Sequence, residues 1–136
     1  MEMEITFPGN KRVDAQYRHF TIPTDQPKGQ GGDDSAPAPF DLFIASIGTC
    51  AGIYALGFMQ QRNIPTEGSR IHLRADRDPD TKLIGTITLD IVLPSGFPEK
   101  YTEAIIKAVE LCAVKRHLHQ PPQFHIQTHI GEPTLA

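Results

Sequence analysis

The two cysteines, Cys50 and Cys112, are the side chains of this chain best suited to chemistry. A thiolate is a strong nucleophile, and a pair of thiols can pass between the reduced and disulfide states. Two cysteines cannot form the dense disulfide framework of a small secreted domain. The pair is therefore either inert packing or a redox site.

Cys50 lies in a segment without charged residues that runs from Leu42 to Met59. An apolar environment raises the pKa of a thiol, so a reactive Cys50 needs a cation from elsewhere in the fold. Arg12 and Arg18, on the predicted N-terminal strands, are the candidates to supply that cation. Both could equally be solvated charges on a strand face, and Cys50 could be a small buried hydrophobe.

Cys112 is predicted near the end of a second helix, where the negative end of the helix dipole disfavours a thiolate. Lys115 and Arg116 follow it by three and four residues and act in the opposite direction, so the sign of its pKa shift stays open. A poorly ionised thiol can still resolve a sulfenic acid, because that step depends more on proximity than on a low pKa. The pattern favours Cys50 as the attacking thiol and Cys112 as the resolving thiol.

The six histidines raise the question of a metal site. His117 and His119 lie where a helix is predicted to end, and their spacing fits neither a helix face nor a zinc finger. His125 and His129 share one face of a predicted strand, but four residues of strand separate them by about 13 Å. We expect exposed histidines, no bound metal and no cofactor.

The elements that must position these groups follow from the hydrophobic pattern. Alternation predicts strands, and helical spacing predicts the helices. The predicted order is three strands, a helix, two strands, a helix and a last strand, over residues 4–7, 13–17, 19–22, 42–59, 71–76, 86–93, 98–119 and 124–130. A polar loop, 23–39, follows the first three strands and is too long for an ordinary tight connection. The fold class is α+β with a largely antiparallel sheet and two main helices, βββ-α-ββ-α-β, in one domain over 1–136.

The helix predicted over 42–59 approaches the length of a membrane span. Ser46, Thr49 and three glycines interrupt its apolar run, and no basic cluster flanks it. We therefore expect a buried core helix and no membrane partner. A helix that is apolar on all sides must be covered on all sides, and in a chain this small a partner subunit would supply the cover.

Composition narrows the possible partners and compartment. The 136 residues have a formal net charge of −3, which argues against a nucleic-acid groove or a polybasic membrane surface. The first residues, Met1 to Glu4, have neither the basic nor the apolar region of a signal peptide. We therefore expect a cytoplasmic protein that does not bind nucleic acid.

The segment from Pro37 to Cys50, PAPFDLFIASIGTC, resembles the OsmC/Ohr family of osmotically inducible and organic-hydroperoxide-resistance proteins. The family's proline–acid–leucine start, small-residue helix and terminal cysteine are all present. Residues 110–114, ELCAV, resemble the family's second-cysteine segment, and the glycine-rich loop at 29–32 also agrees. The resemblance covers nearly the whole chain and is strongest to the general OsmC-like branch.

This resemblance implies an intertwined homodimer with two active sites at the subunit interface, and a thiol peroxidase in oxidative-stress defence. Cys50 would attack the O–O bond of a hydroperoxide, Cys112 would condense with the sulfenic acid, and an external dithiol would reduce the disulfide. The family's hydroperoxide reductases carry a glutamate, bound to an activating arginine, ten positions before the reactive cysteine. Phe40 stands there in this chain, and Asp41 is about half a turn away on the helix.

The missing glutamate motivates a second hypothesis from another class. The chain would be a non-catalytic module that binds a small or lipid-like ligand in an apolar interfacial pocket, with structural cysteines. Fast, selective alkylation of Cys50 near neutral pH would count against this hypothesis.

Overall fold

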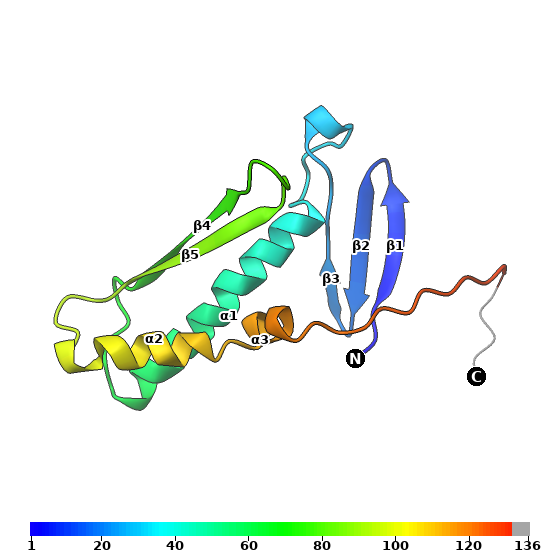
Figure 1. Cartoon of the computed structure of the whole chain (residues 1–136). Helices are drawn as coiled ribbons and strands as arrows, with labels where there is room; N and C mark the ends of the chain where they lie inside the picture. The colour runs from blue at the N-terminus through cyan, green and yellow to red at the C-terminus, as the bar shows by residue number, and fades with distance from the viewer. Residues whose placement is uncertain (132–136) are drawn as a thin grey trace.

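The computed structural model describes residues 1–131, and the α+β class predicted from the sequence is confirmed (Figure 1). The elements are β1 (Glu4–Gly9), β2 (Arg12–Tyr17), β3 (Phe20–Ile22), the 3-10 turn η1 (Lys28–Gln30), α1 (Pro39–Gln61), β4 (Arg70–Arg77), β5 (Ile84–Val92), the 3-10 turn η2 (Glu99–Tyr101), α2 (Thr102–Glu110) and α3 (Ala113–His119). The last five residues of the predicted domain, 132–136, lie outside the described residues.

The first three strands form an antiparallel meander with β2 in the centre. Asn10 turns the chain from β1 to β2 with a φ of 46°, and Arg18 turns it from β2 to β3 with a φ of 55°. Asparagine tolerates this left-handed conformation well. Arg18 adopts the same conformation without that local preference.

The polar loop after β3 is folded around a buried carboxylate. Asp25 is fully buried, and its side chain accepts hydrogen bonds from the backbone N–H groups of Gln26, Asp33 and Ser35 and from the Ser35 hydroxyl. These bonds, that from the Ser35 hydroxyl first, lower the pKa of Asp25 from 3.8 to about 2. A Cβ at Gly32 would lie 1.9 Å from the Gln26 carbonyl oxygen, so only glycine fits there. The loop is thus an ordered lead into α1.

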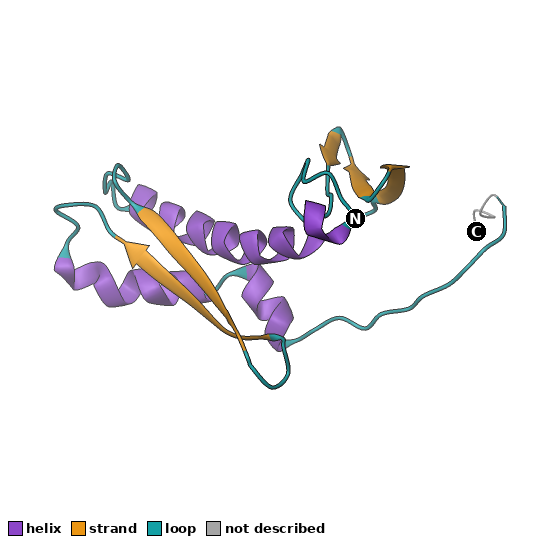
Figure 2. Cartoon of the chain, turned by 90° about the horizontal axis from the view of Figure 1, so that it is seen from above, coloured by secondary structure: helices purple, strands orange, loops and turns teal. Residues whose placement is uncertain are grey.

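The core lies where α1 meets α2 and the β4–β5 hairpin. The hairpin lies along one side of α1, and α2 packs against another (Figures 1 and 2). The buried residues of this core are Ala51, Ala55, Phe58 and Met59 from α1, and Ile105 and Val109 from α2. Small residues allow the close approach, since a Cβ at Gly48 would already lie 3.3 Å from Leu73. This core holds the middle of α1 in place.

A single chain covers α1 only in part. Of the most apolar 18-residue window of α1, 28% is buried, and its mean hydropathy is 1.8. Within residues 1–131, α1 is the one helix that is long and apolar enough to cross a membrane, judged by length and composition only. The chain exposes 10802 Å². A compact protein of 15.1 kDa would expose about 7,100 Å², so much apolar surface is open in one copy.

Three details differ from the predicted elements. The second helix is broken, because α2 ends at Glu110 and α3 begins at Ala113. The strands form two separate sheets rather than one. Residues 124–130, predicted as the last strand, leave the helices as an extended segment without strand pairing (Figures 1 and 2). Their alternating pattern is strand-like, but a strand forms only where a sheet edge is within reach, and Ile126 is 91% exposed.

Candidate active site

Cys50 and Cys112 lie side by side in the folded chain. Cys50 is in the middle of α1, and Cys112 stands immediately before α3 as its N-cap residue. Their side chains are within hydrogen-bonding contact, and both thiols are free. Cys112 is completely buried, whereas Cys50 is half-buried. The fold thus joins two thiols that are distant in sequence and exposes the one from α1.

The break between α2 and α3 directs backbone N–H groups at Cys50. The first N–H groups of a helix have no partner within the helix. In α3 these include those of Ala113 and Val114, and hydrogen bonding by both lowers the pKa of Cys50. The N–H of Val114 is the largest cause that lowers the pKa of Cys50 below its ordinary value, although burial of the thiol acts against it. Cys112 and the N–H of Ala113 lower this pKa further.

Cys112 is shifted in the opposite direction. Burial is the largest cause that raises the pKa of Cys112, and the nearby Cys50 raises it further. The N–H groups of Lys115 and Val114 counteract this only in part. The sequence placed Cys112 near the end of a helix, and it does follow the end of α2 by two residues, but the break also makes it the N-cap of α3. Cys50 is therefore the more easily ionised thiol, and Cys112 holds its proton.

The two candidate arginines lie in the N-terminal sheet. Arg12 on β2 forms an ion pair with Asp14, with 2.7 Å between Nη2 and Oδ2, and Asp14 is 4% exposed. The guanidinium of Arg18 lies 6.0 Å from the ring centre of Tyr17. The groups that shift the pKa of Cys50 belong to residues 112–114, and neither arginine is among them. Within one chain, the structure does not bring the arginines to the cysteines.

The first turn of α1 holds the position of the missing family glutamate. Phe40 packs there against Phe43, with 5.5 Å between the ring centres. Asp41 is used to cap α1, because its Oδ2 accepts the N–H of Ala38 at 3.0 Å. The acidic residue of the first turn thus caps the helix through Oδ2, and an aromatic side chain stands at the position of the glutamate.

The histidines of the described chain form no candidate metal centre. Across residues 1–131 there is no cluster of three or more His, Cys, Asp or Glu side chains that could hold a metal ion. His117 donates from Nδ1 to the carbonyl oxygen of Ala113, with 2.6 Å between the two atoms. This histidine therefore supports α3, whose first N–H groups face Cys50.

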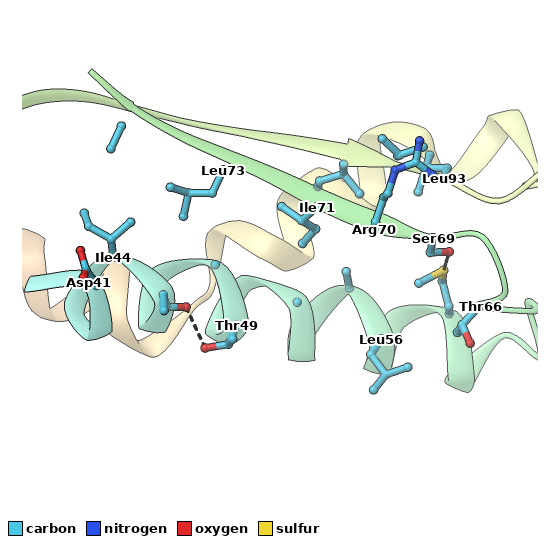
Figure 3. A pocket seen from close by; sticks show the side chains of 18 of the residues that line it. Asp41, Ile44, Thr49, Leu56, Thr66, Ser69, Arg70, Ile71, Leu73 and Leu93 are labelled. Atoms are coloured by element: carbon cyan, nitrogen blue, oxygen red, sulfur yellow. Dashed lines mark hydrogen bonds between the residues drawn. The ribbon is translucent and has the colours of Figure 1, made fainter. Parts of the chain in front are cut away.

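Of the grooves that flank α1, one lies on the side of the hairpin and another on the side of α2. The larger, of about 950 Å³, runs between α1 and the β4–β5 hairpin. Figure 3 shows Ile71 and Leu73 of the hairpin pointing toward α1, with Asp41 near one end and Ser69 and Arg70 near the other. A smaller groove, of about 530 Å³, lies between α1 and α2. The larger groove is mainly apolar and faces away from α2.

Nothing in the amino-acid sequence indicated which groups polarise Cys50. Backbone N–H groups are carried by almost every residue, so their direction has no side-chain signature. Between Thr102 and His119 there is no glycine or proline that would have indicated the break. Only the position of α3 makes Ala113 and Val114 part of the site.

Comparisons with known proteins place this arrangement in a wider group. The model of the OsmC-like protein family matches residues 31–127. A protein of Psychrobacter arcticus 273-4, described as an osmotic stress induced and detoxification response protein, has a TM-score of 0.71 at 19% identity, over 84% of this chain and 85% of that chain.

Two further solved structures share the fold. An OsmC-like protein of Mycoplasma pneumoniae has a TM-score of 0.66 at 18% identity, over 89% of each chain. An organic hydroperoxide resistance protein of Legionella pneumophila has a TM-score of 0.53 at 17% identity, over 86% of this chain and 87% of that one. No sequence among the curated proteins matches this chain.

Proposed function

Because the chain belongs to the OsmC-like protein family, we propose that it is a thiol-dependent hydroperoxide reductase that protects against oxidative stress. The observation that carries the proposal is the contact between an accessible thiol with a lowered pKa, Cys50, and a buried thiol with a raised pKa, Cys112. A peroxide is reduced by a thiolate, and the resulting sulfenic acid needs a second thiol nearby.

The reaction proceeds in three balanced steps. The Cys50 thiolate attacks the terminal oxygen of the hydroperoxide, the O–O bond breaks, and the alkoxide takes a proton and leaves as an alcohol. The Cys112 thiol then attacks the sulfur of the Cys50 sulfenic acid, so that a disulfide forms and water leaves. An external dithiol reduces this disulfide and is itself oxidised to a disulfide. In the cytoplasm that we propose as its location, reducing conditions would maintain such a dithiol.

Peroxide consumption with matched serine variants tests the proposal. Wild type, Cys50→Ser and Cys112→Ser are each incubated with cumene hydroperoxide and dithiothreitol. We expect Cys50→Ser to be inactive, and Cys112→Ser to accumulate a sulfenic acid that dimedone traps. One equivalent of peroxide without reductant should convert wild type into the Cys50–Cys112 disulfide. Wild-type consumption no faster than that of Cys50→Ser would reject the enzyme hypothesis.

We also propose that the chain acts as a homodimer. One copy exposes about 3,700 Å² more than a compact chain of its mass, and an obligate homodimer buries about 1,000–2,500 Å² or more on each copy. The open sides of α1 and the unpaired, alternating segment 124–130 are surfaces that a second copy would cover. Arg12 and Arg18 of the other copy would then have a route to Cys50. Sedimentation equilibrium should give twice 15.1 kDa, and a monomer at micromolar concentration would contradict the proposal.

The groove of about 950 Å³ favours one alternative function, a module that binds an apolar ligand without catalysis. In that case Cys50 would react with iodoacetamide like an ordinary thiol, and both serine variants would keep their ligand affinity. The lowered pKa of Cys50 supports the reductase instead, because it predicts that Cys50 is alkylated faster than an ordinary thiol at the same pH.

A further inference from the structure

The helix that follows the cysteine pair, α3, is weakly packed. It has seven residues, Ala113–His119, and all of their side chains are exposed or half-buried. A helix shorter than about 12 residues is marginal in water, so α3 depends on its contacts with the rest of the chain. A groove of about 580 Å³ lies between α3 and β5, and Leu118, which faces it, is 48% exposed. The side-chain packing that holds α3 in place is therefore slight.

The first turn of α3 contacts both thiols. Cys112 is its buried N-cap residue, and the carbonyl oxygen of Cys112 accepts the N–H of Arg116 at 3.1 Å. The N–H groups of Ala113 and Val114 lower the pKa of Cys50 by hydrogen bonding. Such coupling is reciprocal, so the Cys50 thiolate stabilises this turn by the same free energy with which the turn stabilises the thiolate. The order of α3 thus depends in part on the charge of Cys50.

Formation of a disulfide changes both thiols at once. The two sulfurs give two electrons and their remaining protons to the oxidant, and Cys50 can then carry no negative charge for the N–H groups of α3. The new bond also draws Cys112 closer to Cys50 than two free thiols can lie. On one side of Cys112, α2 is anchored by Ile105 and Val109, which are 1% and 4% exposed. On the other side the side chains of α3 are exposed or half-buried, so we expect α3 to move.

We propose that α3 is a redox-controlled cover of the cysteine pair, ordered beside the two free thiols and opened when the Cys50–Cys112 disulfide forms. The proposal rests on the reductase function above, because that reaction makes the disulfide in every cycle. Cys112 is completely buried, so opening of α3 exposes its side of the disulfide to the external dithiol. Reduction restores the Cys50 thiolate, and α3 closes again.

The movement is confined to residues 113–119. In Figures 1 and 2, α3 stands between the end of α2 and the extended segment that leads away from the helices. Cys112 is buried before α3, and a second copy of the chain would hold residues 124–130 after it. We therefore expect a short local opening between two fixed ends, with α2 and the β4–β5 hairpin unchanged.

Amide hydrogen exchange of the whole protein in its two redox states tests the proposal. The disulfide is made with diamide, an azo compound that takes up the electrons and protons of the two thiols, so the comparison does not depend on any peroxide activity. Exchange of each peptide is followed by mass. We expect residues 113–119 to exchange about ten-fold faster in the disulfide form, and residues 102–110 of α2 to exchange at the same rate in both forms.

Cleavage by trypsin is a second measure of the opening. Lys115 and Arg116 are adjacent cleavage sites within α3, and Lys107 is a matched site within α2. A protease cuts a native chain only where it is locally open. Cleavage after Lys115 or Arg116 should therefore be about ten-fold faster in the disulfide form, with no change after Lys107. Cys50→Ser cannot form the disulfide, and treatment with diamide should change neither rate in this variant.

Equal or slower exchange of residues 113–119 in the disulfide form would overturn the proposal, because the bond would then hold α3 in place. Equal acceleration in α2, or a response of Cys50→Ser to diamide, would also overturn it, because the opening would not be specific to α3 or to the disulfide. The exchange comparison uses wild type alone, so it stands even if the variant folds poorly. A chain that consumes no peroxide but opens α3 after diamide would refute the reductase function and retain the redox-controlled cover.

Discussion

Replacing Ala113 with proline removes one of the N–H groups that polarise Cys50 while preserving α3. Ala113 is the first residue of α3, where proline is well tolerated. A residue before proline must be extended, and Cys112 already is, with φ −47° and ψ 125°. The substitution therefore deletes a hydrogen bond to the Cys50 sulfur with little other change.

The size of the effect follows from the energy of that hydrogen bond. A hydrogen bond to a charged group contributes about 1.5–3 kcal/mol, and one pKa unit corresponds to about 1.4 kcal/mol. Ala113 contributes less than Val114, and Cys50 is only half-buried, so we expect its pKa to rise by up to about one unit. At a pH below the pKa, the thiolate fraction and the alkylation rate would then fall up to about ten-fold.

The pH profile of iodoacetamide alkylation at Cys50 measures this shift. The midpoint should move to higher pH in Ala113→Pro and stay in place in Ala113→Ser, which keeps the N–H. Circular dichroism would verify that α3 is retained. An unmoved midpoint in the proline variant, or the same shift in the serine variant, would refute the assignment of the backbone N–H groups as thiolate donors.

Three other perturbations have defined outcomes. Cys112→Ala should raise the pKa of Cys50 by removing a hydrogen bond that lowers it, and thiolate titration of the variant would contradict this if the pKa fell. The low pKa of Asp25 stabilises the fold fully above pH about 4, and this contribution declines as the pH falls toward 2. The free energies of unfolding of wild type and Asp25→Asn, measured in urea, should therefore converge over that range. Ile105→Ala should lower the free energy of unfolding in urea by about 2–5 kcal/mol, because Ile105 is 1% exposed and is buried between α1 and α2. A decrease of less than about 1 kcal/mol would contradict this packing.

The local hydrophobic periodicity was sufficient to predict most of the helices and strands. The alternation at 71–76 and 86–93 predicted the hairpin, and the uncharged run at 42–59 predicted α1, which extends over Pro39–Gln61. These patterns are readable because each side chain's face follows from its spacing along one element. The strand expected at 124–130 did not form, since its pairing depends on an edge that one chain does not place beside it.

The sequence by itself determined the two thiols, the apolar helix around Cys50 and the resemblance to the OsmC/Ohr family. Only the tertiary structure decided that the thiols touch, that Cys112 begins a helix, and that backbone N–H groups rather than an arginine of the same chain face Cys50. The reason is physical. A thiol's identity is local, but its pKa depends on which dipoles and charges the fold brings to it.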